Sequence, residues 1–203
     1  MSKLNPCVVP VMGATGSGKS QALMRMLAKQ KPARSLIWNP MQKKTRYAGE
    51  ECTRLVDLVD GLGAKGKFNR VFVPTWDFDL MREQFEIFCG FCLELENLTV
   101  LVEELKYVTR PGWAPPNWRR VTGDGRQYGL RVFGTSQRPA QIDKDFLGNA
   151  TLIRTGRLAY HEDVETMSKY MLVPEEQINA LQPLDWIEKN KETGEVAKGR
   201  LAF

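Results

Sequence analysis

A glycine-rich segment near the start of the chain carries the clearest chemical signal. It reads Gly13-Ala-Thr-Gly-Ser-Gly-Lys-Ser20 and fits the pattern G-x-x-x-x-G-K-[S/T] completely. Glycines let backbone N–H groups curl around phosphate oxygens, and the positive end of the following helix attracts the same phosphates. Lys19 is expected to reach the β- and γ-phosphates, and Ser20 to offer its hydroxyl to Mg²⁺. The segment predicts that ATP and Mg²⁺ bind here, through the residues Gly13, Ala14, Thr15, Gly16, Ser17, Gly18, Lys19, Ser20 and Gln21.

Two adjacent acids, Glu103 and Glu104, follow an apolar segment at residues 98–102. A strand that ends in acids brings carboxylates to the carboxyl edge of a parallel sheet, where the glycine-rich loop also lies. We expect Glu103 to hold Mg²⁺, usually through water, and Glu104 to polarise the attacking water as general base. Most families with such a glycine-rich loop have Asp at the position of Glu103, the first of the two acids. The alternative is a pair of surface acids at a strand end, but a second acid next to the metal-binding one favours ATP hydrolysis.

A third segment runs from Arg126 to Pro139 and contains an apolar strand at residues 130–135. Gln137 follows this strand, where a polar side chain beside the γ-phosphate can sense whether that phosphate is present. Arg126 precedes the strand on the outer flank, where it could reach the nucleotide of a neighbouring subunit. The alternative is an ordinary strand followed by a helix that proline initiates. Arg119 and Arg120 lie close enough in sequence to supply the arginine instead.

The elements that must position these residues alternate between strand and helix. This alternation predicts an α/β fold, with a mainly parallel sheet and helices on both faces. Together with the glycine-rich loop, such a sheet resembles the RecA/ASCE-like P-loop fold. Residues 184–203 alternate polar and apolar around a Thr-Gly turn, which predicts a C-terminal β-hairpin at the edge of the sheet. We expect residues 1–203 to form one domain. The expected strands are 7–12, 35–38, 71–74, 98–102, 130–135 and 151–155, and the expected helices are 19–30, 51–62 and 79–96.

Composition excludes several classes of protein. Hydrophobic residues make up 42% of the 203 residues and charged residues 26%, which is the balance of a soluble globular domain. No apolar run is long enough to span a bilayer, so we expect no transmembrane segment. Four cysteines are too few for a disulfide framework, and a single histidine, His161, nearly excludes a His-based triad or a His-rich metal site. The net charge of +5 permits contact with a polyanion without establishing it.

The third segment resembles a known family. The spacing Arg126-x-x-Gly129 before the strand, the run Thr135-Ser-Gln-Arg-Pro139 after it and the apolar segment 149–154 are similar to the FtsK–HerA superfamily of DNA-pumping ATPases. The size is similar to that of the genome-packaging ATPases of tailless, membrane-containing viruses such as tectiviruses. Trp38-Asn39-Pro40 resembles the Trp-Asp-Pro type of sequence common in that group, from which Asn39 departs. The resemblance covers roughly residues 8–158.

This resemblance implies a homo-oligomeric ring that hydrolyses ATP and moves double-stranded DNA into a preformed capsid. It implies a place in the host cytoplasm and in the virion, with capsid or membrane vertex proteins as partners. Carried over to this chain, Arg126 matches the arginine finger that acts in trans, and Gln137 matches the γ-phosphate sensor. Two alternatives remain: a filamentous-phage assembly and secretion ATPase, and a small-molecule P-loop kinase.

Residues 104–126 are predicted to form a loop in which positive charge alternates with tryptophan. Such a loop suits contact with a DNA backbone, which a translocase must make without reading sequence. Alternatively, Trp113 and Trp118 pack at a subunit interface. Outside this loop, Cys89 and Cys92 have the spacing of a metal or redox pair, but they lie on the apolar face of a predicted helix and are expected in the core. The candidate DNA-binding residues are Lys106, Arg110, Arg119 and Arg120.

Overall fold

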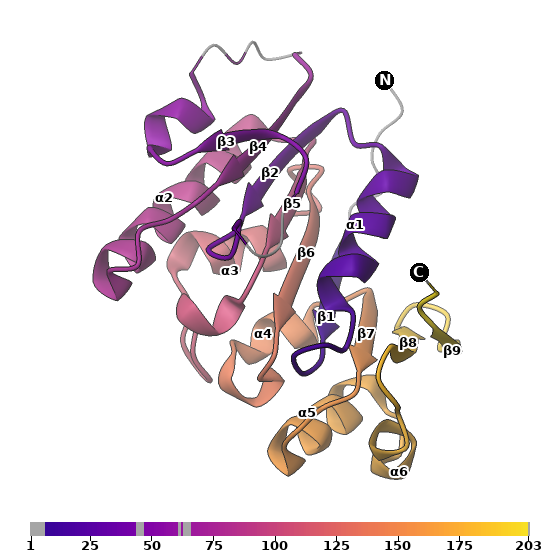
Figure 1. Cartoon of the computed structure of the whole chain (residues 1–203). Helices are drawn as coiled ribbons and strands as arrows, with labels where there is room; N and C mark the ends of the chain where they lie inside the picture. The colour runs from indigo at the N-terminus through magenta and orange to yellow at the C-terminus, as the bar shows by residue number, and fades with distance from the viewer. Residues whose placement is uncertain (1–6, 44–46, 61, 63–65, 203) are drawn as a thin grey trace.

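The computed structural model describes residues 7–43, 47–60, 62 and 66–202 (Figure 1). In this part of the chain nine strands form one sheet, in the order β3-β4-β2-β5-β6-β1-β7-β8-β9. Neighbouring strands from β3 to β7 are parallel, and β8 and β9 are antiparallel. The predicted mainly parallel α/β fold with a C-terminal hairpin is confirmed. The strands are β1 (Cys7–Met12), β2 (Arg34–Trp38), β3 (Glu50–Cys52), β4 (Phe68–Phe72), β5 (Thr99–Val102), β6 (Arg131–Ser136), β7 (Leu152–Gly156), β8 (Asp185–Asn190) and β9 (Val196–Arg200).

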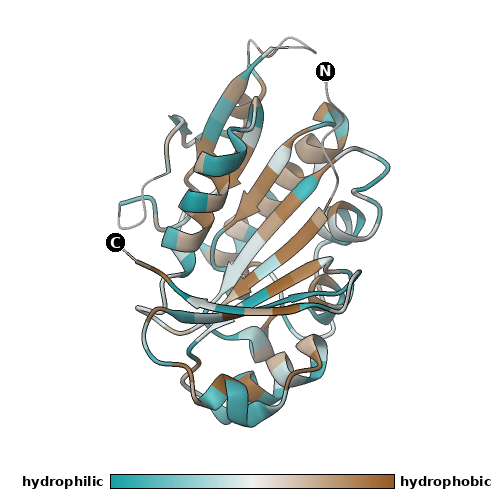
Figure 2. Ribbon diagram, turned by 90° about the vertical axis from the view of Figure 1, so that its right-hand side faces the viewer, coloured by the Kyte–Doolittle hydropathy of each residue, from teal (hydrophilic) through white to brown (hydrophobic). Residues whose placement is uncertain are grey.

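Helices cover both faces of the sheet, as predicted. Successive side chains of a strand point to opposite faces, so Val8 joins one apolar cluster while Val9 joins the other. In Figure 2 the central strands are mostly hydrophobic, and hydrophilic residues are common on the helices. The helical segments are α1 (Lys19–Gln30), η1 (Leu55–Leu58), α2 (Phe78–Leu95), η2 (Leu105–Tyr107), α3 (Pro116–Gly123), η3 (Pro139–Gln141), α4 (Lys144–Gly148), α5 (His161–Met171) and α6 (Glu175–Asn179).

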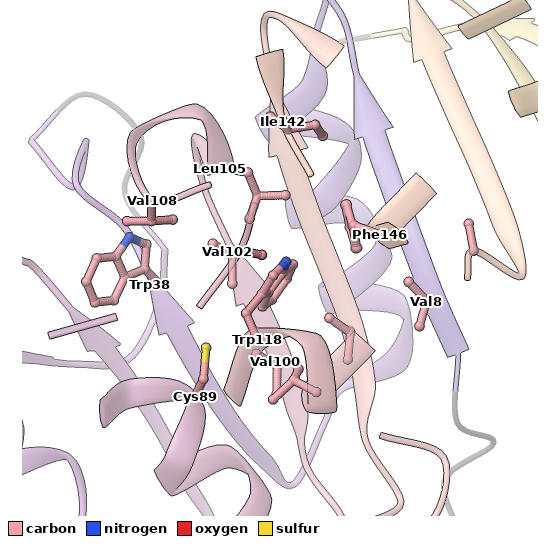
Figure 3. Packing of buried hydrophobic residues seen from close by; sticks show 14 of the residues in the cluster. Val8, Trp38, Cys89, Val100, Val102, Leu105, Val108, Trp118, Ile142 and Phe146 are labelled. Atoms are coloured by element: carbon pink, nitrogen blue, oxygen red, sulfur yellow. The ribbon is translucent and has the colours of Figure 1, made fainter. Parts of the chain in front are cut away.

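The larger apolar cluster contains a group of aromatic rings between the sheet and helices α2, α3 and α4. Trp38 lies 5.0 Å from Phe85 between ring centroids, and Trp118 lies 5.3 Å from Phe146. Figure 3 shows Trp38, Cys89 and Trp118 in this cluster, close to the side chains of β5. Burial of such large rings dominates core energetics. This packing therefore fixes the positions of the carboxyl ends of β1, β5 and β6.

Two expectations about local structure are wrong. A helix is predicted over 51–62, of which residue 61 lies outside the described residues. Instead, Glu50–Cys52 is strand β3, which pairs with β4, and a 3-10 turn follows at Leu55–Leu58. Arg70 contributes to this difference, because its guanidinium donates to the carbonyl oxygens of Asp57 and Asp60. The strand expected at 71–74 is β4, which begins at Phe68 and ends before Pro74, a residue without an N–H to donate.

The expected loop at 104–126 is also partly wrong, because it contains helix α3. Pro116 occupies the first helical position, which suits its fixed φ. Trp118 of this helix is fully buried in the larger cluster, so it is available neither to DNA nor to another subunit. Trp113, by contrast, is 43% exposed.

The C-terminal hairpin adds to the β7 edge of the sheet and its last residues return to α1. Leu201 donates its N–H to the Leu184 oxygen, and Arg25 of α1 donates to the Ala202 oxygen. The tail therefore packs beside the start of α1. Among the described residues, every helix is too short or too polar to cross a lipid bilayer.

Candidate functional site

The glycine-rich loop joins β1 to α1 at the carboxyl edge of the sheet. Gly18 is the N-cap of α1 with φ 89°, a left-handed conformation that favours glycine, and a Cβ at this position would lie 2.4 Å from the Leu201 Cδ1. Lys19 donates from its Nζ to the Ala14 oxygen at 3.2 Å, so the side chain folds back over the loop. The first turn of a helix leaves unpaired N–H groups that can donate to phosphate oxygens. Thr15, Gly16 and Gln21 are exposed on this side.

The two predicted acids lie at the end of β5 and both are buried. Glu103 is 3% exposed and Glu104 is 6% exposed. Glu104 has φ 55°, a left-handed backbone conformation that is costly for a residue with a side chain and is common at functional sites. Its N–H donates to the Thr135 Oγ1 at 3.1 Å. The backbone at this point is therefore held in the orientation that turns Glu104 toward the glycine-rich loop.

Gln137 connects the glycine-rich loop to Glu104. It follows β6, which lies between β1 and β5 in the sheet. The Thr15 hydroxyl donates to the Gln137 Oε1 at 2.8 Å, and the Gln137 Nε2 donates to the Glu104 Oε1 at 2.8 Å. The structure thus brings together the loop, the second acid and Gln137, which the sequence places in three separate segments.

Lys19 and the two acids interact electrostatically. Burial lowers the pKa of Lys19 below its ordinary value, and the charges of Glu104 and Glu103 oppose that shift. The second oxygen of Glu104, Oε2, lies 3.7 Å from the Lys106 Nζ. Within the described residues no hydrogen-bond donor reaches this buried oxygen. Glu104 therefore presents an acceptor atom that a water molecule could donate to.

Two hydroxyls that sequence reasoning missed hold the carboxylate of Glu103. Tyr47 donates to Oε1 and Thr135 donates to Oε2. The Tyr47 hydroxyl also lies near the side chain of Ser20, the serine of the glycine-rich loop. Thr135 could have been noticed as a polar residue at the buried end of an apolar strand, whereas the sequence around Tyr47 carries no signal for this contact.

These oxygen donors fit Mg²⁺. Among the described residues there is no cluster of three His, Cys, Asp or Glu side chains. Mg²⁺ does not need one, because it usually binds through one or two protein ligands together with substrate phosphates and water. Ser20 and Glu103 are the residues that would hold it.

Arg126 lies at the opposite edge of the sheet from the site just described. It precedes β6 and therefore sits at the amino edge, where its Nη2 lies 3.1 Å from the Glu192 Oε1 in the turn of the C-terminal hairpin. Its side chain is 59% exposed. Arg126 therefore cannot complete the site of its own chain, and it is open to a neighbouring molecule.

Arg138 has a structural contact that the sequence did not indicate. Its Nε donates to the Asp163 Oδ2 at 2.7 Å, and its guanidinium stacks over the Tyr160 ring at 3.8 Å. Asp163 is fully buried and also accepts from the Ala140 N–H. In the Gln-Arg-Pro segment, the glutamine faces the site while the arginine holds α5 in place.

The candidate DNA-binding residues lie in different surroundings. Lys106 is only 23% exposed and pairs with Glu104, so it lies beside the acids. Arg110, Arg119 and Arg120 are exposed, and Arg120 donates to the Tyr128 hydroxyl at 2.9 Å.

Cys89 and Cys92 lie in the core, as expected. Cys89 and Cys92 are fully buried in the larger apolar cluster, and burial raises the pKa of both thiols. His161 is exposed at the start of α5.

Comparison with known proteins supports the fold and the resemblance. No family model matches the chain. Protein P9 of Pseudoalteromonas phage PM2 is 33% identical over 138 residues, which are 66% of this chain and 61% of that protein. The chain thus matches about three fifths of the length of this curated relative.

Solved structures are similar over nearly the whole chain. The genome-packaging NTPase B204 of Sulfolobus turreted icosahedral virus 2, in complex with AMPPCP, has a TM-score of 0.74 at 16% identity, and the match covers 98% of this chain and 99% of B204. VirB4 of Thermoanaerobacter pseudethanolicus has a TM-score of 0.65 at 12% identity, covering 96% and 89%. The pCW3 conjugation coupling protein TcpA has a TM-score of 0.60 at 15% identity, covering 97% and 60%. At the level of the fold, the predicted resemblance to ATPases of the FtsK–HerA type is confirmed.

Proposed function

We propose that this protein is an ATP-hydrolysing DNA translocase that packages viral double-stranded DNA into a preformed capsid. The observation that carries the proposal is the continuous contact from Thr15 through Gln137 to Glu104, which joins a phosphate-binding loop to a buried carboxylate. The similarity in fold to a viral genome-packaging NTPase with a bound ATP analogue supports it.

The chemistry follows from the positions of the side chains. The amides of the glycine-rich loop and Lys19 would hold the triphosphate, and Ser20 and Glu103 would hold Mg²⁺, which supplies charge neutralisation on the phosphate oxygens. A water that donates to the Glu104 Oε2 attacks the γ-phosphorus while the bond to the ADP oxygen breaks. Glu104 accepts the proton of that water. Gln137 orients Glu104 and is placed to detect loss of the γ-phosphate through its contact with the loop.

A second protomer would complete the site. Arg126 is at the amino edge of the sheet and the nucleotide loop is at the carboxyl edge, so one molecule cannot bring the two together. Head-to-tail packing places the amino edge of one protomer against the carboxyl edge of the next, and such heterologous contacts close into rings. An arginine supplied in this way neutralises charge that develops in the transition state. The exposed ion pair with Glu192 is weak enough to be exchanged for this contact.

DNA contact is assigned to the exposed arginines Arg110, Arg119 and Arg120. They would neutralise backbone phosphates without reading bases. Lys106 is better placed to adjust Glu104 than to reach DNA. Capsid or membrane vertex proteins would anchor the ring, in the host cytoplasm during assembly and in the virion afterwards.

The two alternative functions have less support. A small-molecule kinase passes phosphate to an acceptor, whereas we propose that Glu104, held by Gln137, acts on water. For a filamentous-phage secretion ATPase, we find no feature in the described residues that favours it over a packaging ATPase.

The test is steady-state ATPase activity of the purified protein with and without double-stranded DNA, over a range of salt concentrations. We expect DNA to stimulate hydrolysis and the stimulation to fade as salt rises, because contacts with phosphates release counterions. Lys19→Ala should abolish activity at every salt concentration. Phosphate transfer to a small acceptor, with no response to DNA, would contradict the proposal.

A further inference from the structure

Tyr47 is a buried phenol at the centre of the expected metal site. Its side chain is 4% exposed, and its ring belongs to the apolar cluster of Val9, Ala22 and Leu23 on the α1 face. Its hydroxyl donates to the Glu103 carboxylate and lies near the Ser20 side chain. A single tyrosine thus lies beside both residues that would hold Mg²⁺.

The direction of the hydrogen bond to Glu103 suits metal binding. A phenol is protonated at neutral pH, so Tyr47 acts as the donor to the Glu103 carboxylate. The phenol oxygen is then left as an acceptor for the nearby Ser20 hydroxyl, whose lone pairs would remain for a cation. Thr135 donates to the other oxygen of Glu103. Each carboxylate oxygen is held by one hydroxyl and keeps further lone pairs for metal-bound water.

This arrangement explains how glutamate can serve where most families have aspartate. Glutamate has one more rotatable bond, and without restraint its carboxylate would sample more positions. Tyr47 and Thr135 remove that freedom by fixing both oxygens of Glu103.

The segment after β2 holds Tyr47 in place. Gln42 contacts both backbone polar groups of Tyr47. Its Nε2 donates to the backbone carbonyl oxygen of Tyr47, and its Oε1 accepts from the backbone N–H of Tyr47, each at 3.4 Å. Asn39 donates from its Nδ2 to the same Gln42 Oε1 at 2.7 Å and accepts from the Met41 N–H at 3.0 Å. Asn39, which departs from the Trp-Asp-Pro type of sequence, therefore helps to hold Gln42, and Gln42 in turn holds the backbone of Tyr47.

We propose that Tyr47 is a positioning residue of the divalent-cation site, which sets the Glu103 carboxylate for the Mg²⁺ that accompanies the nucleotide. The proposal rests on the proposed nucleotide chemistry. Partners that orient metal ligands typically change metal affinity 10- to 100-fold when they are removed.

The test compares Tyr47→Phe with the parent protein and with Tyr128→Phe, which removes a phenol hydroxyl at the opposite edge of the sheet. Affinity for a fluorescent ATP analogue is measured against Mg²⁺ concentration and in EDTA, and Mn²⁺ binding is followed by electron paramagnetic resonance. For Tyr47→Phe we expect that the Mg²⁺ concentration that gives half of the increase in ATP-analogue affinity rises about 10-fold or more. The affinity for the ATP analogue in EDTA should be unchanged. Tyr128→Phe should match the parent.

Two further controls keep the outcome clear. Thermal unfolding shows whether Tyr47→Phe folds, and Gln42→Leu, which removes the support while keeping the phenol, should shift the Mg²⁺ dependence in the same direction. If Tyr47→Phe binds metal as the parent does, or more tightly, the inference is overturned while the proposed function stands. If the parent binds no nucleotide at any Mg²⁺ concentration, the proposed function itself fails.

Discussion

Replacement of Gln137 by leucine should separate hydrolysis from nucleotide binding. Leucine is similar in size but can neither donate to Glu104 nor accept from Thr15. The bond to the Glu104 carboxylate involves a charged group, and such hydrogen bonds are worth about 1.5–3 kcal/mol. If that contact orients Glu104 in the transition state, its loss lowers kcat by about 10- to 150-fold. Nucleotide affinity should change little, because the loop amides and Lys19 remain.

The assay is single-turnover ATP hydrolysis together with equilibrium binding of an ATP analogue. Gln141→Leu is the matched control, because it makes the same chemical change at an exposed glutamine four residues further along. A kcat within twofold of the parent would refute the reasoning. A loss confined to nucleotide affinity would refute it as well, since it would mean that Gln137 supports the loop and not the acid.

Further predictions concern the base, the α5 anchor and the buried cysteines. Glu104→Gln keeps the shape of the side chain and removes the proton acceptor, so kcat should fall about 10²- to 10⁴-fold with nucleotide binding retained, as measured by single-turnover hydrolysis and analogue binding. Arg138→Ala leaves the carboxylate of Asp163 buried without its ion-pair partner and should lower the free energy of unfolding by about 3–5 kcal/mol in urea titration; an unchanged midpoint would show that the pair contributes little. Cys89 and Cys92, whose burial raises their thiol pKa, should resist a thiol reagent at pH 8 in the native protein and react in denaturant, and labelling of both in native protein would contradict their core position.

The strands that position the site could be predicted from sequence because their signals are local. Continuous apolar runs bounded by glycine or acids mark β1 and β5, and the spacing of apolar residues marks α2. Position at the carboxyl edge then follows from parallel topology, which is why the glycine-rich loop, Glu104 and Gln137 could be expected to meet.

Other parts of the site depend on contacts between residues far apart in the chain. Tyr47 and Glu103 are 56 residues apart, and no pattern around Tyr47 indicates that they pair. Arg138 and Asp163 are 25 residues apart, and only the fold shows that this arginine is used inside the protein. The sequence did not show whether Trp118 is buried, because a tryptophan among arginines suits a surface as well as a core. The helix that buries Trp118 begins at Pro116, in a segment that was predicted to be a loop.

The measurement that tests the central claim most directly mixes two inactive variants, Arg126→Ala and Lys19→Ala. The first keeps its nucleotide loop and lacks the arginine, and the second keeps the arginine and lacks the loop lysine. If the arginine acts in trans across a heterologous interface, a random equal mixture should recover about a quarter of the parent ATPase activity, because about one interface in four combines an intact loop with an intact arginine. An Arg126→Ala variant that retains full activity, or a mixture that recovers none, would contradict the account.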